Sequence, residues 1–274
     1  MRVAIQGFEG CFHQIAAQGY YGKNIEIECC ASFAELVKKT KQQQVADAGV
    51  MAIENSIAGS ILPNYSLLKN SGLHVIGEVY LQIKQHLMVL PGQKLEDIRE
   101  VHSHYMALLQ CSDFLEKYPN MKLVETEDTA LSAKHVQQKK LKSTAAIAGK
   151  LAADIYGLEI IAPNIHTIKN NYTRFLVISP NGVEPQEDAN KASVYFQTSH
   201  DSGSLAKVLT QVAAAGINLS KLQSFPMPTK EWNYYFHADF EFDDLQHFQR
   251  AVKKIESLTE HLKVLGIYKK GNTH

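Results

Sequence analysis

Five short segments of small polar residues follow strand-like runs and together could bind a small anion. They are residues 6–13, 54–60, 86–87, 103–105 with Gln110, and 170–175. Backbone N–H groups at helix starts, aided by hydroxyl and amide side chains, bind carboxylates without any net positive charge. Arg174 adds a planar guanidinium that can grip a carboxylate through two parallel hydrogen bonds. Grouped at one edge, these segments favour a cleft for a carboxylate-bearing small molecule.

Each segment taken singly also has an ordinary structural explanation. Residues 54–56 have the composition of a turn that caps a helix. Arg174 could be a solvated residue of an edge strand, and Gln6 with Gly7 could simply end a strand. The cleft is favoured because all five segments follow predicted strands of one sheet system.

The charge balance and the absence of several motifs exclude other classes of protein. Lys plus Arg number 28, as do Asp plus Glu, so nothing predicts a nucleic-acid or membrane partner. The first residues form too short an apolar run for a signal peptide, and no run is long enough to span a bilayer. We therefore expect a cytoplasmic protein, in which Cys11, Cys29, Cys30 and Cys111 are reduced.

No metal site and no cofactor are predicted. The sequence contains no HExxH, no Cys/His ligand spacing and no Walker-type loop. Gly7 and Gly10 are spaced as GxxG, which is not the dinucleotide-binding GxGxxG. His102 and His104 lie two residues apart but have no evident third ligand, so ordinary polar roles are favoured.

The elements that must position these segments alternate between strand and helix over the first 180 residues. This alternation predicts an α/β fold with mainly parallel sheets covered by helices on both faces. The expected strands are 3–6, 25–30, 48–53, 74–79, 101–103, 122–125, 145–148, 160–162 and 174–178, and the expected helices are 12–21, 32–41 capped by Ser32, 60–70, 107–118 and 129–137.

A polar stretch at residues 179–190, with two prolines and a glycine, separates this part from a smaller C-terminal unit. Residues 181–190 are the predicted linker, and residues 191–274 form a ferredoxin-like βαββαβ unit. Its expected strands are 192–198, 218–225, 232–242 and 261–268, and its expected helices are 204–215 and 245–255. The third strand alternates from Trp232 to Phe242, which is typical of a half-buried strand.

Seven stretches, in this order, resemble the prephenate dehydratase family: 7–17, 54–61, 85–92, 103–111, 127–133, 145–158 and 170–178. Residues 203–226 resemble an ACT domain, a module that senses small molecules. The resemblance implies a monofunctional enzyme whose catalytic domain, 1–180, has the two-lobed fold of type 2 periplasmic-binding proteins. Its lobes would be about 1–82 with 165–180, and about 83–164, followed by an ACT domain at 191–274.

The resemblance also implies an activity and a set of roles. Prephenate would lose water and carbon dioxide to give phenylpyruvate, a step of phenylalanine biosynthesis that needs no cofactor. Thr173 would donate to the leaving oxygen, Arg174 would bind a carboxylate, and Phe175 would pack beside the ring. The side chains expected to line the substrate pocket are Asn55, Ser56, Ser103, His104, Gln110 and Asn171.

The sequence departs from the family pattern in two places. In the opening loop, Cys11 and His13 stand where the family has hydroxyl-bearing residues. In the ACT domain, two charged positions of the family are occupied by Gln223 and Phe225. The resemblance places phenylalanine, as an inhibitor, between paired ACT domains of a homodimer or homotetramer, at Gly203, Ser204, Leu205, Asn218, Gln223, Ser224, Phe225 and Pro226.

Two other functions remain open from sequence alone. One is arogenate dehydratase, which performs the same chemistry on an aminated substrate. The other is a non-catalytic protein that uses the two-lobed fold to capture a small anion, because fold alone does not give function. A pure binding protein has no need of a leaving-group donor such as Thr173, which favours the enzyme.

Overall fold

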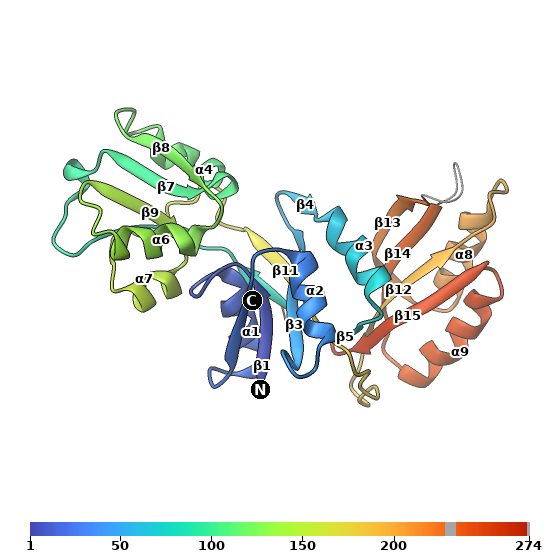
Figure 1. Ribbon diagram of the computed structural model, residues 1–274. Helices are drawn as coiled ribbons and strands as arrows, with labels where there is room; N and C mark the ends of the chain where they lie inside the picture. The colour runs from blue at the N-terminus through green and yellow to red at the C-terminus, as the bar shows by residue number, and fades with distance from the viewer. Residues whose placement is uncertain (228–233, 273–274) are drawn as a thin grey trace.

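Three sheets lie in a row in the computed structural model of the chain, which describes residues 1–227 and 234–272. The first sheet occupies the middle, the second lies on one side of it, and the C-terminal sheet lies on the other (Figure 1). No helix within the described ranges is both long and apolar enough to cross a bilayer. The mixed α/β architecture with two lobes confirms the predicted fold class.

The first sheet has the strand order β2-β1-β3-β11-β5, with β4 paired to β3. Its strands are β1 (Arg2–Gln6), β2 (Glu26–Cys30), β3 (Ala48–Asn55), β4 (Gly59–Ser60), β5 (His74–Gln82) and β11 (Tyr172–Ser179). Helix α1 (Phe12–Tyr21) packs on one face, and α2 (Phe33–Lys41) and α3 (Leu62–Ser71) pack on the other. The Ser32 hydroxyl accepts from the Glu35 backbone N–H at 3.2 Å, so the predicted cap of α2 is confirmed.

The second sheet has the order β10-β6-β9-β7-β8 and is built entirely from the chain between β5 and β11. Its strands are β6 (His86–Val89), β7 (Glu100–His104), β8 (Lys122–Thr126), β9 (Thr144–Ala148) and β10 (Glu159–Ala162). Its helices are α4 (Tyr105–Gln110), α5 (Ser112–Leu115), α6 (Thr129–Gln138) and α7 (Lys150–Tyr156), with a short 3-10 turn, η1 (Leu95–Asp97).

The expectation of mainly parallel sheets is wrong. Only β1 with β2 and β3, and β7 with β8 and β9, pair in parallel among the strands of these two sheets. Strand β11 runs antiparallel to both β3 and β5, because the chain returns through it from the second sheet to the first. The predicted helix 107–118 is also two short helices, α4 and α5, which meet at Cys111.

The C-terminal sheet has the order β13-β14-β12-β15 and is antiparallel throughout. Its strands are β12 (Lys191–Gln197), β13 (Asn218–Pro226), β14 (Tyr234–Glu241) and β15 (His261–Tyr268), and its helices are α8 (Ser204–Ala214) and α9 (Leu245–Glu256). The element order is the predicted βαββαβ. Trp232, which begins the alternation noted in the sequence, lies outside the described residues.

The two faces of the C-terminal sheet are covered differently. Helices α8 and α9 enclose an apolar core on one face, centred on Phe240 and Phe248. The other face packs on the first sheet and α3, where Phe225, Tyr235 and Leu265 share a core with Tyr65. The C-terminal unit is thereby fixed to the first lobe, on the side away from the second lobe (Figure 1).

Candidate active site

A cavity of about 350 Å³ lies between the first and second sheets. Both lobes contribute to its wall, and most of the lining is apolar or uncharged. The lining residues are Gln6, Cys11, Phe12, His13, Phe33, Ala52, Asn55, Ala58, Ile61, Ile83, Gln85, His104, Met106, Ala107, Gln110, Glu127, Asp128, Thr129, Thr173 and Phe175. Of the predicted site residues, the structure brings together Asn55, His104, Gln110, Thr173 and Phe175.

The Thr173 hydroxyl is held by a buried amide network. The Asn55 Oδ1 accepts from the backbone N–H groups of Ile57 and Ala58, at 3.0 and 2.9 Å. This fixes the orientation of the amide, so that its Nδ2 donates to Thr173 Oγ1 at 3.0 Å and to Asn171 Oδ1 at 2.7 Å. Because Asn55 already occupies a lone pair of Oγ1, the hydroxyl hydrogen remains available to donate to a ligand.

An aromatic wall lies beside this hydroxyl. Phe175 follows Thr173 by two residues on β11, so both side chains are on the same face. The His13 ring packs edge to face on the Phe175 ring, with 5.0 Å between the ring centroids, and its centroid lies 5.5 Å from that of the Phe33 ring. Burial lowers the pKa of His13 to about 3, and its Nε2 accepts from the Ala52 backbone N–H at 3.3 Å. His13 is therefore a neutral wall residue at physiological pH.

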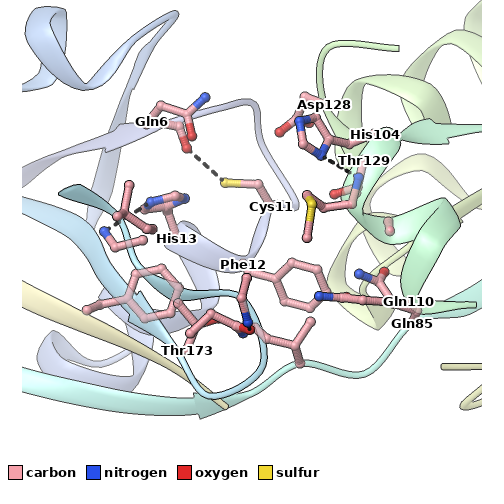
Figure 2. Close-up of a pocket in the computed structure, with 18 of the residues that line it drawn as sticks. Gln6, Cys11, Phe12, His13, Gln85, His104, Gln110, Asp128, Thr129 and Thr173 are labelled. Atoms are coloured by element: carbon pink, nitrogen blue, oxygen red, sulfur yellow. Dashed lines mark hydrogen bonds between the residues drawn. The ribbon is translucent and has the colours of Figure 1, made fainter. Parts of the chain in front are cut away.

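The opposite end of the cavity is polar and belongs to the second lobe (Figure 2). His104 caps α4, with its Nδ1 accepting from the Met106 backbone N–H at 3.2 Å, so in the neutral ring Nε2 is the donor. Asp128 caps α6, with its Oδ1 accepting from the Leu131 backbone N–H at 2.8 Å. Burial raises the pKa of Asp128.

Arg174 does not line the cavity, which corrects the predicted role of binding a substrate carboxylate. Its side chain leaves the opposite face of β11, because neighbouring residues of a strand point to opposite sides. There it donates to Glu78 at 2.7 Å, to Asp239 of β14, and to the Tyr268 hydroxyl at 3.2 Å. Arg174 does grip carboxylates, as its chemistry suggests, but they belong to the protein itself.

This ionic cluster joins the first lobe to the C-terminal sheet. Glu78 also accepts from Lys191 at 3.0 Å, and Asp239 accepts from the Ser193 hydroxyl at 2.6 Å. Burial opposes the charge on Asp239, but the attraction of Arg174 outweighs it and holds the pKa of that carboxyl well below its usual range. Arg174 is 5% exposed. A substrate in the cavity has no access to the guanidinium.

Three other predicted lining residues do not line this cavity either. The Ser103 hydroxyl is fully buried and donates to the Ile147 carbonyl at 2.7 Å, which fixes β7 to β9. Ser56 is exposed and accepts from the Tyr172 backbone N–H at 2.9 Å. Asn171 is buried behind Asn55, so it positions that amide and does not face the pocket. These side chains support the site because they hold the loops and strands around it.

Sequence reasoning missed other lining residues, above all Gln85 and Asp128. The Gln85 Oε1 is buried with no hydrogen-bond partner among the described residues, which is unusual away from functional sites. Cys11, which stands where the family has a hydroxyl-bearing residue, also lines the cavity. Burial and then the charge of Asp128 raise the pKa of Cys11 to about 12, and its Sγ donates to the Gln6 carbonyl at 3.6 Å. This thiol is not an activated nucleophile.

The predicted effector residues lie at the start of α8 and along β13 in the C-terminal unit. Gly203 and Ser204 begin α8, and Asn218 begins β13, where its Nδ2 donates to Glu241 at 3.4 Å. Phe225 instead stacks on Tyr235 and is buried against the first lobe. Its side chain is therefore a contact between the two units.

No group of three or more His, Cys, Asp or Glu side chains that could hold a metal ion occurs in the part of the chain that the structure describes. The four cysteines are free thiols.

The geometry defines a class of protein: a two-lobed α/β enzyme with an oriented hydroxyl and an aromatic wall inside its cleft, joined to a small βαββαβ unit. The sequence model of the prephenate dehydratase family matches residues 3–183. The chain belongs to the prephenate dehydratase family. The alternative of a protein that only captures an anion is therefore set aside.

Individual relatives agree over nearly the whole chain. The arogenate dehydratase/prephenate dehydratase 2 of Arabidopsis thaliana is 35% identical over 279 residues, covering 98% of this chain and 72% of that one. The structure of prephenate dehydratase with L-Phe from Arthrobacter aurescens has a TM-score of 0.88 at 26% identity, over 98% of this chain and 90% of that one.

A similar structure carries a different activity. The quorum-quenching acylase GqqA has a TM-score of 0.89 at 27% identity, over 98% of both chains.

Proposed function

We propose that this chain converts prephenate to phenylpyruvate, with loss of water and carbon dioxide. The observation that carries the proposal is the Thr173 hydroxyl, which Asn55 orients at an aromatic wall inside the cleft. The reaction needs a donor for a departing hydroxyl and no electron sink, because the ring gains aromaticity as the two groups leave. No cofactor is required.

Thr173 acts on the leaving oxygen. As the bond from the ring to its carboxylate breaks, the electron pair enters the ring and the carbon–oxygen bond opposite breaks. A hydrogen bond from Oγ1 stabilises the charge that develops on that oxygen, which leaves as hydroxide and becomes water by taking up a proton from the solvent. Asn55 supports this step because its Nδ2 prevents the hydroxyl from turning its lone pair toward the substrate.

The apolar wall and the polar end of the cavity bind different parts of the substrate. Phe175, His13 and Phe33 pack against the ring and exclude water, which strengthens the hydrogen bond at Thr173. The carboxylates are bound by the His104 Nε2–H of the second lobe and by the backbone N–H groups that begin α1 in the first lobe. Gln110 contributes an uncharged amide to the same cavity.

The direct test is an assay of the purified full chain with prephenate, read as the absorbance of phenylpyruvate. We expect turnover without any added metal or cofactor, and unchanged turnover after treatment with a chelator. Absence of phenylpyruvate, with the protein shown to be folded by circular dichroism, would refute the proposal. Arogenate is assayed in parallel as the second substrate, read as phenylalanine.

We further propose that phenylalanine binds the C-terminal unit as an inhibitor. Support comes from the solved relative that holds L-Phe, and from the segments around Gly203, Ser204, Leu205, Asn218, Gln223, Ser224 and Pro226. Calorimetry and the phenylpyruvate assay are run with millimolar phenylalanine. Neither heat of binding nor inhibition at that concentration would disprove the regulatory role.

Self-association and a cytoplasmic location belong to the same proposal. Strand β13 is the outer strand of the C-terminal sheet, so its free edge can pair with a second copy to give a homodimer or homotetramer. Light scattering after gel filtration measures the mass directly, and a monomer at all concentrations would contradict this. Cell fractionation tests the location.

A further inference from the structure

We propose that Asp128 is a specificity-determining residue that binds the ammonium group of an aminated substrate, so that the chain converts arogenate as well as prephenate, with the higher kcat/KM for arogenate. The inference rests on the proposed dehydratase function and adds to it the substrate class that this cleft prefers. Sequence alone does not separate the two substrates, and relatives named for either one match the chain closely.

The charges that line the cavity are the first observation. Among its described lining residues there is neither a lysine nor an arginine, while Glu127 and Asp128 are both acidic. Arg174, the basic residue nearest in sequence to Thr173, is turned away and neutralised by Glu78 and Asp239. A doubly negative substrate therefore finds no cationic side chain in this wall, whereas a substrate that carries its own ammonium group finds a carboxylate.

The position of Asp128 is the second observation. Its Oδ1 caps α6, and its Oδ2 reaches across the cleft to the first lobe, where a Cβ added to Gly7 would lie only 2.9 Å from it. Gly7 has φ +106°, so the loop both requires glycine and leaves room for this carboxylate. Asp128 is half-buried, whereas Glu127 is exposed to solvent and so interacts more weakly with a ligand.

The shape of the substrate decides which of its groups meets Asp128. In both substrates the departing hydroxyl is on the ring carbon opposite the one that carries the carboxylate and the three-carbon side chain. Figure 2 shows Thr173 on one side of the cavity and Asp128, His104 and Thr129 on the other. When Thr173 Oγ1 donates a hydrogen bond to the departing hydroxyl, the three-carbon side chain at the opposite end of the ring lies near Asp128.

The two side chains differ in the group that they present there. Prephenate presents a keto oxygen, which can only accept a hydrogen bond and is repelled by a carboxylate. Arogenate presents an ammonium, whose three N–H donors match a carboxylate acceptor. The His104 Nε2–H at the same end is available to the neighbouring carboxylate of either substrate. Asp128 therefore discriminates through the amino group alone.

The test is the ratio of kcat/KM for arogenate to kcat/KM for prephenate, measured in wild type and in Asp128→Asn. Asparagine has the same shape and still caps a helix, so α6 is retained. We expect kcat/KM for arogenate to fall about tenfold to hundredfold, as for loss of a charged hydrogen bond, while that for prephenate rises. Asp128→Ser, which also caps helices, repeats the test should the asparagine variant fail to fold.

A matched control and the pH profile sharpen the assignment. Asp154→Asn removes an exposed carboxylate from α7, and its ratio should equal that of wild type. Burial raises the pKa of Asp128, so kcat/KM for arogenate in wild type should fall on acidification as this carboxyl becomes protonated. In Asp128→Asn, kcat/KM for arogenate should not show this fall at acidic pH.

The outcomes separate this inference from the function on which it rests. An enzyme that converts prephenate but not arogenate, or whose ratio stays within about threefold in both Asp128 variants, overturns the role of Asp128 and leaves the dehydratase intact. A wild-type chain that converts neither substrate overturns both.

Discussion

On one face of β11, Thr173 and Phe175 line the cleft, whereas on the other face Arg174 is enclosed between the first lobe and the C-terminal sheet. The strand continues the same division, because Val177 belongs to the core around α1 and Leu176 to the core shared with the C-terminal sheet. The three consecutive residues 173–175 look like one motif, but two of them line the cleft and the middle one belongs to the contact with the C-terminal sheet.

The comparison teaches that one strand can connect a reaction site to a domain contact without any intervening residue. Arg174 and Thr173 are neighbours on β11, so a change in the ion pair between Arg174 and Asp239 can shift the backbone that positions the Thr173 hydroxyl. The two faces should nevertheless respond differently to mutation. Substitutions on the cleft face should lower turnover, and substitutions on the buried ionic face should lower stability.

The largest expected effect is that of Thr173→Ala on turnover. Loss of the positioned donor should lower kcat by about 10²–10⁴-fold, while KM changes little because the aromatic wall and the polar end still bind the substrate. Thr173→Ser keeps the hydroxyl and should retain most of the activity. Steady-state kinetics with prephenate and arogenate measure both variants, and full activity of the alanine variant would remove Thr173 from the mechanism.

On the other face, Arg174→Met should destabilise the fold. Removal of the guanidinium leaves Glu78 and Asp239 buried beside an apolar side chain, which costs about 3–5 kcal/mol. Urea unfolding measures this loss, and Arg250→Met, on the exposed side of α9, is the matched control without an effect. A stable variant with a greatly raised KM would instead return Arg174 to the substrate site.

A smaller effect is expected where β15 of the C-terminal sheet packs against β5 of the first lobe. A Cβ added to Gly266 of β15 would lie 1.8 Å from the Val75 carbonyl oxygen of β5, so the two strands must separate in Gly266→Ala. Overpacking of this kind costs about 1–3 kcal/mol. We expect a lower melting temperature by calorimetry. Gly216→Ala is unsuitable as a control because its φ is positive. Gly19→Ala is the better control, because the added Cβ meets nothing within 4 Å and alanine favours the helix α1, so the melting temperature should not fall and should rise slightly.

Much of the fold follows from local patterns. Helix α1 and strand β15 begin and end at the predicted residues, because their periodicity and end residues agree with their burial. The single helix expected at 107–118 and the mainly parallel sheets were wrong for a common reason: breaks such as Cys111 and returns such as β11 are set by contacts distant in the sequence.

The site was predictable only in part. Strand alternation could have separated Arg174 from Thr173, but nothing near Arg174 shows that Asp239, 65 residues later, would be its partner. Asp128 looks like an ordinary helix cap, which it also is, and local sequence cannot show that α6 begins at the cleft. Gln85 lies between two strands of different sheets, where no periodic pattern marks it.

The smallest expected effect is the pH dependence of the stability that the ion pair between Arg174 and Asp239 provides. Asp239 has a pKa well below the value of about 3.9 of an unfolded chain, so its contribution to stability is present above that value and is lost as the pH falls through the lower, folded-state pKa. In Arg174→Met the guanidinium no longer opposes burial, and the pKa of Asp239 should rise. The stability difference between wild type and variant should therefore be largest near neutral pH and shrink below about pH 4. Urea midpoints between neutral pH and about pH 3 measure it, and a difference that stays constant over this range would show that Arg174 stabilises through packing and not through charge.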